Sequence, residues 1–388
     1  MDYNKILSER SKNLQPSGIR KFFDIAAGVP DIISLSVGEP DFKTPYPIRK
    51  EAIRILEKGK TNYTGNSGLS PLKAAVSDYF KRTINCNYDP EGEIVITVGG
   101  SEAIDISIRA LVNYGDEVII PEPCFVSYSP IVELTGGVAI PAVTRAEDNF
   151  KLTPEILKPL ITDKTKALIL SFPNNPTGAV MRRDELEAVA KLLRGTNIIV
   201  LSDEIYSELT YGEPHVSIAQ IDGMYERTIV VNGFSKAFAM TGWRLGFVAA
   251  PAPITEQILK IHQYAIMCSP TVSQYAAITA LGEECLSEVR TMAAEYDNRR
   301  KFVLKRLREI GLDCFTPEGA FYVFPCIKSS KMSSKEFCTR LIHEKSVAVV
   351  PGDAFGESGE GFVRISYAYS MKHLTTALAR IEEFLKRE

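Results

Sequence analysis

Short apolar runs alternate with longer amphipathic segments through the middle of the chain. Continuous rather than alternating hydrophobicity is typical of strands that are buried on both faces of a parallel sheet. The segments between the runs, such as 102–113 and 183–194, carry the apolar spacing of helices. The pattern therefore predicts an α/β fold whose mainly parallel sheet is covered by helices on both sides. Strands are expected at residues 94–98, 117–120, 167–170, 198–201 and 228–231.

Towards the C-terminus the pattern changes to that of a smaller α+β unit. A long charged amphipathic helix over 293–310 opens this part, and a helix from residue 371 closes it. We expect the first forty or so residues to join this unit. The expected large domain is then 46–285, and the small domain is formed by 1–45 and 286–388. Between the two helices the sequence predicts strands near 320–325, 347–350 and 362–366 and a helix over 334–345.

Polar, glycine-rich or proline-rich residues follow each of the five predicted strands of the large domain. Open α/β sheets bind their ligands outside the carboxyl ends of the strands. These five ends therefore outline one binding site. The segments concerned are 99–102, 121–125, 173–178, 202–206 and 232–236.

Composition and charge exclude several classes of function. The 388 residues carry a net charge of −3, and no basic run or RNA-binding motif indicates a nucleic-acid partner. No apolar run approaches the roughly 20 residues that are needed to span a bilayer. The seven cysteines form no CxxC pair and no zinc-type spacing. We expect a cytoplasmic protein with reduced thiols and without a metal site, a membrane partner or a nucleic-acid partner.

The segment 232–247 holds the most informative chemistry. Lys236 and Arg244 lie there in a small, apolar, glycine-punctuated stretch. Cations in such surroundings are unfavourable unless each has an anionic or covalent partner. A desolvated lysine loses its proton readily and forms a Schiff base, and the arginine fork binds a phosphate. Pyridoxal 5′-phosphate carries both the aldehyde and the phosphate, so the pair predicts this cofactor.

Residues at the other strand ends fit the same cofactor. Asp203 follows an apolar strand and suits a partner for a protonated pyridine nitrogen; a loop cap is the alternative. Tyr206 and Asn175 are candidate donors to the ring's phenolic oxygen, with a core tyrosine and a turn former as the alternatives. Phe125 either stacks on the ring or belongs to the core. Each residue alone is ambiguous, but together they supply the groups that this cofactor's chemistry needs.

The segment 99–102 contains Gly100, Ser101 and Glu102 between a predicted strand and a helix start. Backbone N–H groups at a helix N-terminus attract an anion such as a phosphate. The alternative is that Ser101 caps the helix and binds no ligand.

Three further residues are candidates for ligand contacts. Arg364 lies among strand-forming residues and either clamps a substrate carboxylate or forms a surface ion pair. Tyr63 lies in a glycine-rich turn that exposes its hydroxyl group. Gly38 offers a backbone N–H where no side chain would fit.

With these motifs in place, the chain resembles fold-type I, pyridoxal-phosphate-dependent aminotransferases of class I/II, such as the aspartate and aromatic aminotransferases. The resemblance extends from 35–41 to 364–366, and its most specific parts are 174–178 and Ser235-Lys236 with Arg244. It implies a large domain with a mostly parallel seven-stranded sheet, a smaller α+β domain, and a homodimer with shared active sites.

The resemblance also implies a role for each candidate. Lys236 would carry the cofactor as an imine, Asp203 would pair with the pyridine nitrogen, and both would be catalytic together with Tyr206. The cofactor-binding residues it implies are Gly100, Ser101, Glu102, Phe125, Asn175, Asp203, Tyr206, Ser235, Lys236, Arg244 and, in the neighbouring subunit's site, Tyr63. The implied substrate-binding residues are Gly38, Asn175 and Arg364. One departure is Gly233, where several family members have a hydroxyl residue.

The implied activity is ping-pong transfer of an amino group from an L-amino acid to a 2-oxo acid, with 2-oxoglutarate as the expected acceptor. A carbon–sulfur β-lyase on the same fold is the alternative, and a DNA-binding regulator is disfavoured because no basic recognition helix precedes the large domain. The amino donor cannot be read from the chain. Candidate specificity residues are Arg20, Lys21 and Phe22 within 17–22, the stretch 262–269, and Tyr322, although surface charge and interface packing explain each equally well.

Overall fold

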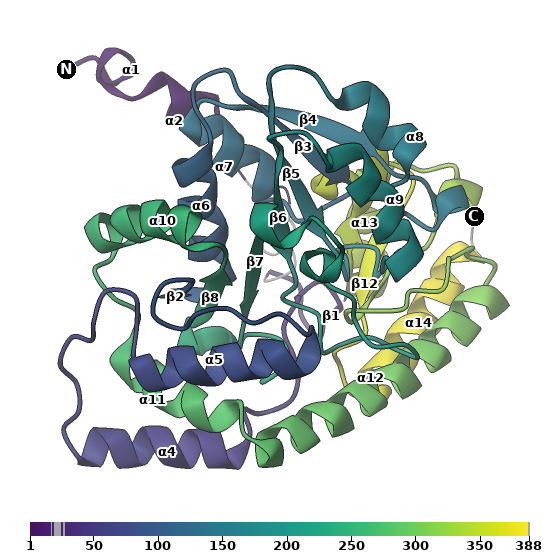
Figure 1. Cartoon of the computed structure of the whole chain (residues 1–388). Coiled ribbons are helices and arrows are strands. Elements are labelled where there is room, and N and C mark those ends of the chain that lie inside the picture. Colours follow the sequence, from purple (N-terminus) through teal and green to yellow (C-terminus); the bar gives the residue numbers. More distant parts are fainter. Residues whose placement is uncertain (17, 19–24, 26–27, 387–388) are drawn as a thin grey trace.

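The computed structural model describes residues 1–16, 18, 25 and 28–386. Its centre is a seven-stranded sheet in the order β2-β8-β7-β6-β5-β3-β4 (Figure 1). β8 is antiparallel to both of its neighbours, and the other neighbouring strands are parallel. The strands are Ile94–Thr97 (β2), Glu117–Glu122 (β3), Val138–Val143 (β4), Thr165–Ser171 (β5), Ile199–Asp203 (β6), Thr228–Gly233 (β7) and Gly246–Ala249 (β8).

Alternate side chains of these strands enter cores on opposite faces of the sheet, because successive residues of a strand point to opposite sides. Ile119, for example, packs into one core and Ile120 into the other. Helices α6, α7 and α10 cover one face, and α5, α9 and α11 cover the other, where α4 packs against α11. These helices are Tyr46–Glu57 (α4), Ser70–Thr83 (α5), Gly99–Leu111 (α6), Tyr128–Thr135 (α7), Arg183–Leu193 (α9), Ala252–Ala265 (α10) and Thr271–Ala280 (α11).

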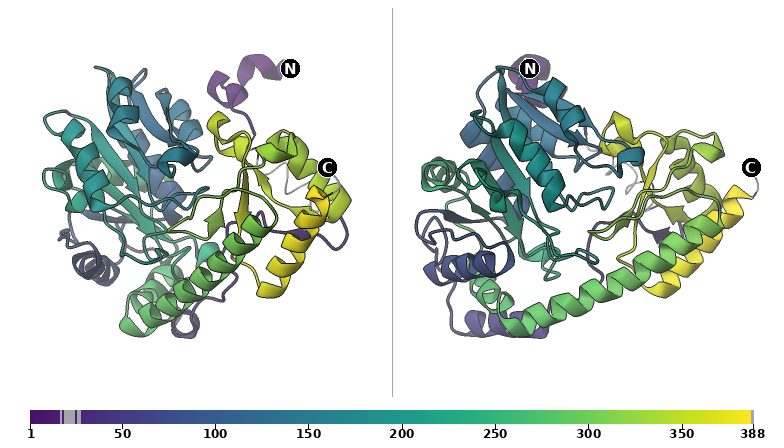
Figure 2. Two further views of the ribbon diagram at one scale, coloured as in Figure 1. Left: turned by 90° about the vertical axis from the view of Figure 1, so that its right-hand side faces the viewer. Right: turned by 45° about the vertical axis from the view of Figure 1, so that its right-hand side comes forward.

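A smaller unit beside the sheet combines the segment around Ile33–Ser34 with the C-terminal part of the chain. It contains the antiparallel sheet β11-β12-β9 and the parallel pair β1–β10, which joins the N-terminal segment to the C-terminal part. The long helix α12 runs from beneath the central sheet to this unit, where it packs against α14 (Figure 2). The elements are Ile33–Ser34 (β1), Tyr322–Val323 (β9), Val347–Ala348 (β10), Val350–Pro351 (β11), Val363–Ser366 (β12), Glu283–Glu309 (α12), Ser334–Lys345 (α13) and Met371–Leu385 (α14).

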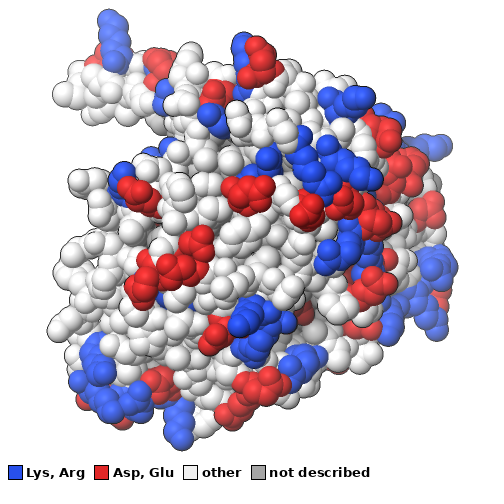
Figure 3. Space-filling view, viewed as in Figure 1, with Lys and Arg blue, Asp and Glu red and all other residues white. Residues whose placement is uncertain are grey.

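The described residues also form the short helices Tyr3–Ile6 (α1), Glu9–Asn13 (α2) and Pro154–Leu157 (α8). α1 projects from the body of the molecule (Figures 1 and 2). Acidic and basic side chains are interspersed on the face shown in Figure 3. None of the helices in the described part of the chain has the length and apolar character needed to cross a membrane.

The predicted α/β architecture and its five buried strands are confirmed. Two strands of the central sheet, β4 and β8, were not predicted, and neither was the short β1 of the smaller unit. β4 is an edge strand whose exposed positions and Pro141 interrupt the apolar run, and β8 is only four residues long. The helix expected from residue 293 begins already at Glu283, directly after Gly282. The domain boundaries at 45/46 and 285/286 stay a prediction.

Candidate active site

A cavity of about 1010 Å³ opens at the carboxyl ends of the parallel strands, where the smaller unit faces the sheet. The segments that follow β2, β3, β5, β6 and β7 all contribute to its wall, as expected for an open α/β sheet. The smaller unit contributes Tyr322 and Arg364. The predicted site residues that line this cavity are Gly38, Gly100, Ser101, Phe125, Asn175, Asp203, Tyr206, Ser235, Lys236, Arg244 and Arg364.

Lys236 extends into the cavity from the loop after β7. Its Nζ donates a hydrogen bond to the carbonyl oxygen of Gly38 at 2.6 Å. The rings of Tyr206 and Phe321 lie 5.9 and 6.0 Å from Nζ. Burial in this setting lowers the pKa of Lys236 to about 8. An appreciable share of the side chain is therefore the neutral amine, which is the nucleophilic and basic form.

Asp203, the last residue of β6, faces the cavity from the floor of the sheet. Its Oδ2 accepts a hydrogen bond from the Tyr128 hydroxyl at 2.7 Å, and its Oδ1 accepts one from the Ile205 N–H at 3.2 Å. The same hydroxyl lies 2.9 Å from Ser171 Oγ. Burial raises the pKa of Asp203, and the Tyr128 hydrogen bond opposes this rise. A carboxylate in this position favours a cationic group of a ligand.

Arg364 comes from β12 and is almost fully buried. Its Nη1 donates to Asn175 Oδ1 at 2.8 Å, and its Nη2 donates to the Ser36 carbonyl at 2.6 Å. The guanidinium lies over the ring of Tyr322, 4.4 Å from the centroid. Its Nε has no hydrogen-bond partner among the described residues. A buried guanidinium whose partners are neutral suits a ligand carboxylate.

The segment 36–41 forms another part of the wall. A Cβ atom at Gly38 would lie 2.3 Å from the Tyr322 hydroxyl, so no side chain fits there. Asp41 anchors the segment, because its two oxygens accept hydrogen bonds at 2.8 Å from Nη1 of Arg299 on α12. The contact that Gly38 makes is through its carbonyl to Lys236, whereas the sequence pointed to its N–H.

One end of the cavity combines a helix N-terminus with a cation. α6 begins at Gly99, so Gly100 and Ser101 lie in its first turn, and Ser101 is not the cap residue. Arg244 Nη2 reaches within 2.9 Å of the place that a Cβ atom on Gly99 would occupy. Ser235 lies in the same wall. Together these groups favour a phosphate or another anion.

The geometry also explains the glycine at position 233. A Cβ atom at Gly233 would lie 2.9 Å from Gly246 Cα and 3.0 Å from the Leu245 carbonyl oxygen. The close packing of β7 against β8 therefore excludes a hydroxyl-bearing side chain at this position. Ser235 supplies the hydroxyl of this loop.

Comparison with known proteins assigns the family. The family model described as aminotransferase class I and II matches residues 30–381, which is most of the chain. The chain belongs to the class I and II aminotransferases. It is 50% identical over 381 residues to a putative aminotransferase, YugH, of Bacillus subtilis, with 98% of each chain covered. It is 48% identical to an aspartate aminotransferase of Pyrococcus abyssi, covering 98% of this chain and 99% of that one.

Solved structures agree with this assignment. An aromatic aminotransferase from Pyrococcus horikoshii superposes with a TM-score of 0.90 at 47% identity, over 95% of this chain and 99% of that chain. The aspartate aminotransferase from Thermus thermophilus with maleate gives a TM-score of 0.93 at 37% identity, over 97% and 99%. The predicted fold type and aminotransferase activity are thereby confirmed. Members of this family depend on pyridoxal phosphate.

Several of the site residues predicted for this aminotransferase lie outside the cavity. Tyr63 is 78% exposed and is absent from the wall of its own chain's cavity. Glu102 is absent from the cavity wall, and its carboxylate accepts a hydrogen bond from the Val98 N–H and lies 2.8 Å from His262 Nδ1. The candidates Arg20, Lys21 and Phe22 lie outside the described residues.

Tyr128, Tyr322 and Glu39 are among the wall residues that were not assigned a role in cofactor chemistry from the sequence. Tyr128 holds Asp203, and Phe125 packs edge-to-face against the Tyr128 ring at 5.6 Å. The Tyr322 hydroxyl lies 2.8 Å from that of Tyr206. Glu39 also lines the cavity. The sequence signal was present for Tyr128, three residues after Phe125 at a predicted strand end, but nothing in the pattern distinguished the two aromatic residues.

The described residues fit a pyridoxal phosphate molecule in four separate respects. The cavity offers a lysine with a depressed pKa and, opposite the helix N-terminus of α6, an arginine for an anion. It also offers a buried carboxylate on the sheet and a second arginine with an unpartnered Nε. An aldehyde, a phosphate, a pyridinium nitrogen and a substrate carboxylate would satisfy these four groups in turn.

Proposed function

We propose that this aminotransferase binds pyridoxal 5′-phosphate at Lys236 and transfers the amino group of an L-amino acid to 2-oxoglutarate. The observation that carries the proposal is the placement of Lys236, Asp203 and Arg364 in one cavity, with the pKa of Lys236 lowered to about 8. When bound, the cofactor supplies an aldehyde and an electron-withdrawing ring. Relatives named aspartate and aromatic aminotransferases support amino acid and oxo acid substrates for this chain.

The ε-amine of Lys236 is the proton carrier in this proposal. Its neutral form would accept the Cα proton of the substrate and release it again, so that one group serves both proton transfers. The Gly38 carbonyl, 2.6 Å from Nζ, orients the amine. Asp203 keeps the ring nitrogen protonated, and Tyr128 holds the Asp203 carboxylate by its 2.7 Å hydrogen bond.

Substrate binding falls to the other end of the cavity. Arg364 binds the α-carboxylate, helped by Asn175, whose Oδ1 fixes the guanidinium at 2.8 Å.

The cofactor phosphate is bound by Arg244, Ser235 and the first turn of α6. Tyr206 and Asn175 contact the phenolic oxygen, and Phe125 stacks on the ring.

We also propose a homodimer in which Tyr63 completes the phosphate site of the neighbouring subunit. The exposure of Tyr63 and its absence from its own cavity support this arrangement. The turn that carries Tyr63 also contacts a second exposed residue, because Asn66 Nδ2 donates to the carbonyl of the exposed Met267 at 2.9 Å.

Hybrid dimers test the shared site. Tyr63→Ala and Lys236→Ala subunits are mixed, so that each hybrid dimer has one doubly altered site and one intact site. We expect turnover well above that of either parent homodimer. Mixtures that show no gain over the Tyr63→Ala parent contradict the shared site.

Borohydride reduction and an amino-donor panel test the activity itself. Reduction should leave a pyridoxyl mass on the peptide that contains Lys236, and the donor panel with 2-oxoglutarate should yield glutamate. Pyruvate and ammonia from a cysteine conjugate, without glutamate, would support the β-lyase instead. Absence of the mass increment contradicts the proposal.

A further inference from the structure

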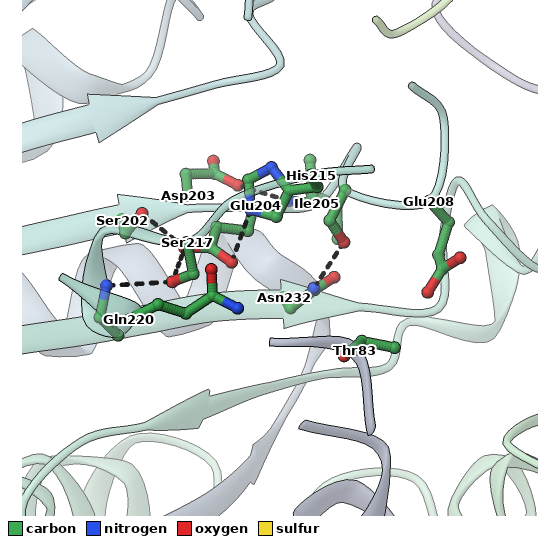
Figure 4. A network of polar contacts seen from close by, with 12 residues as sticks. Thr83, Ser202, Asp203, Glu204, Ile205, Glu208, His215, Ser217, Gln220 and Asn232 are labelled. Carbon is green, nitrogen blue, oxygen red and sulfur yellow. Dashed lines mark hydrogen bonds and ion pairs between the residues drawn. The ribbon is translucent and has the colours of Figure 1, made fainter. Parts of the chain in front are cut away.

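Behind Asp203 lies a second buried carboxylate that the proposed reaction does not use. Glu204 directly follows Asp203, the last residue of β6, and unlike Asp203 it is absent from the cavity wall. The Glu204 side chain is 1% exposed. Figure 4 shows Ser202, Ser217 and His215 gathered around it.

Only one oxygen of Glu204 is satisfied by neutral donors. Oε1 accepts hydrogen bonds from Ser202 Oγ at 2.8 Å and Ser217 Oγ at 2.6 Å. Oε2 lies 2.9 Å from His215 Nε2, within ion-pair distance, but the angle is not that of a hydrogen bond. Neither atom has another hydrogen-bond partner among the described residues. The imidazole of His215 therefore faces this buried carboxylate oxygen at ion-pair distance.

We propose that His215 offsets the buried Glu204 carboxylate and so helps to keep the neighbouring Asp203 ionised, which makes His215 a positioning residue for Asp203. The inference rests on the proposed function, because it concerns the partner of the ring nitrogen. A lone negative charge at Glu204, the next residue in the chain, raises the pKa of Asp203. It would therefore favour transfer of the shared proton from the ring nitrogen to Asp203.

Glu204 also connects the loop that follows Tyr206 to the central sheet. Ser202 belongs to β6, whereas His215 and Ser217 belong to the loop that follows Tyr206. The Glu204 N–H also donates to the Val231 carbonyl on β7 at 2.8 Å. Glu204 thus joins three segments directly beneath Asp203.

Glu204 also affects Asp203 electrostatically. Burial is the largest influence that raises the pKa of Asp203, and the negative charge of Glu204 raises it further.

The test compares the loaded enzyme and three variants. In His215→Leu the buried carboxylate loses its countercharge. In Glu204→Gln the negative charge is removed, while an oxygen stays available for Ser202 and Ser217. The double variant Glu204→Gln/His215→Leu lacks both charges. Ser217→Ala is the matched control, because it removes a hydrogen bond from Glu204 and leaves both charges.

The readouts are the ¹⁵N NMR shift of a pyridine-¹⁵N-labelled cofactor, which reports protonation of the ring nitrogen, and the dissociation constant of the cofactor. We expect His215→Leu to shift the ring nitrogen towards its unprotonated value and to weaken binding on the order of tenfold. Glu204→Gln, the double variant and Ser217→Ala should keep the protonated shift. A purely structural role would make the double variant at least as impaired as His215→Leu.

Each outcome is decisive. An unchanged shift and affinity in His215→Leu overturn the inference, and so does a double variant that fails to restore them. If His215→Leu does not fold, Glu204→Gln tests the inference instead. Loss of the protonated ¹⁵N shift in Glu204→Gln would overturn the inference. A wild-type protein that binds no pyridoxal phosphate overturns the proposed function and this inference with it. If the wild type binds the cofactor normally and all the variants give its ¹⁵N spectrum, only the inference is overturned.

Discussion

Replacing Lys236 with methionine should stabilise the apoprotein while it abolishes transamination. Methionine is unbranched and of similar length, so it fills the same space next to Tyr206 and Phe321. The charged amine gains little in the folded apoprotein, because its hydrogen-bond acceptor is the Gly38 carbonyl rather than a carboxylate. Such a trade of stability for activity is common at active sites.

The magnitude follows from the pKa of Lys236. A fall from 10.5 to about 8 corresponds to about 3 kcal/mol of unfavourable free energy for the charged form at neutral pH. Water in the open cavity screens part of this penalty, because the side chain is only partly covered. We therefore expect Lys236→Met to raise the free energy of unfolding by about 2 kcal/mol at pH 7.

The pH dependence of this stability difference provides a second, independent test. The folded-state pKa lies below the unfolded value of 10.5, so between pH 8 and pH 10.5 the unfolded wild type binds more protons than the folded wild type. The stability of the wild type therefore rises relative to that of the variant across this window. The advantage of Lys236→Met should be full below pH 8 and should have largely vanished by about pH 10.

Urea unfolding of the two apoproteins at pH 7 and pH 9.5, followed by circular dichroism, measures both effects. Lys73→Met is the control, because Lys73 is a buried lysine that, unlike Lys236, is paired with a carboxylate, Glu91 Oε2 at 2.8 Å, and with Ser67 Oγ at 3.1 Å. The control should lose stability. A Lys236→Met protein that is no more stable than the wild type at pH 7, or that keeps its full advantage at pH 9.5, refutes the reasoning.

Three substitutions test the remaining roles. Asp203→Asn should retain part of the cofactor affinity but slow Cα–H cleavage on the order of 100-fold in single-turnover experiments, and near-normal rates would contradict its electronic role. Arg364→Lys should raise the KM of amino and oxo acids alike by roughly 30-fold, because about 2 kcal/mol of charge-assisted bonding is lost; a rise for only one substrate would contradict a carboxylate clamp. Tyr128→Phe removes the 2.7 Å donor to Asp203 and should lower the free energy of unfolding by about 1–2 kcal/mol, with reduced turnover; unchanged values would show that this hydrogen bond contributes little.

The architecture was predictable because burial on both faces leaves a continuous apolar run. All five such runs became central strands, and the sheet brought their carboxyl ends together at one cavity. β4 gave no such signal, since it lies at the edge of the sheet with Val138 and Val143 exposed. Pairing across the sheet, rather than local pattern, determines a strand of this kind.

Within the site, the predictable residues were those whose chemistry is rare in apolar surroundings. Lys236, Asp203 and Arg364 stood out because an isolated charge in a hydrophobic run is costly. Tyr128 did not stand out, because a tyrosine is at home in a core and only the tertiary fold shows its hydroxyl 2.7 Å from Asp203. Tyr322 was a candidate for substrate specificity, whereas the fold shows that its hydroxyl excludes any side chain at position 38.

The adjacent acids Asp203 and Glu204 show where local pattern stops being informative. Alternation along a strand already implies that the two carboxylates face opposite sides of the sheet, so at most one of them lines the cavity. The pattern cannot say what lies opposite the other one. His215 and Ser217 reach Glu204 only because the chain after Tyr206 returns to the same face of the sheet. A buried charge that is obvious in the sequence thus has a partner that is obvious only in the fold, and residues that act through such a partner are the ones that sequence reasoning misses.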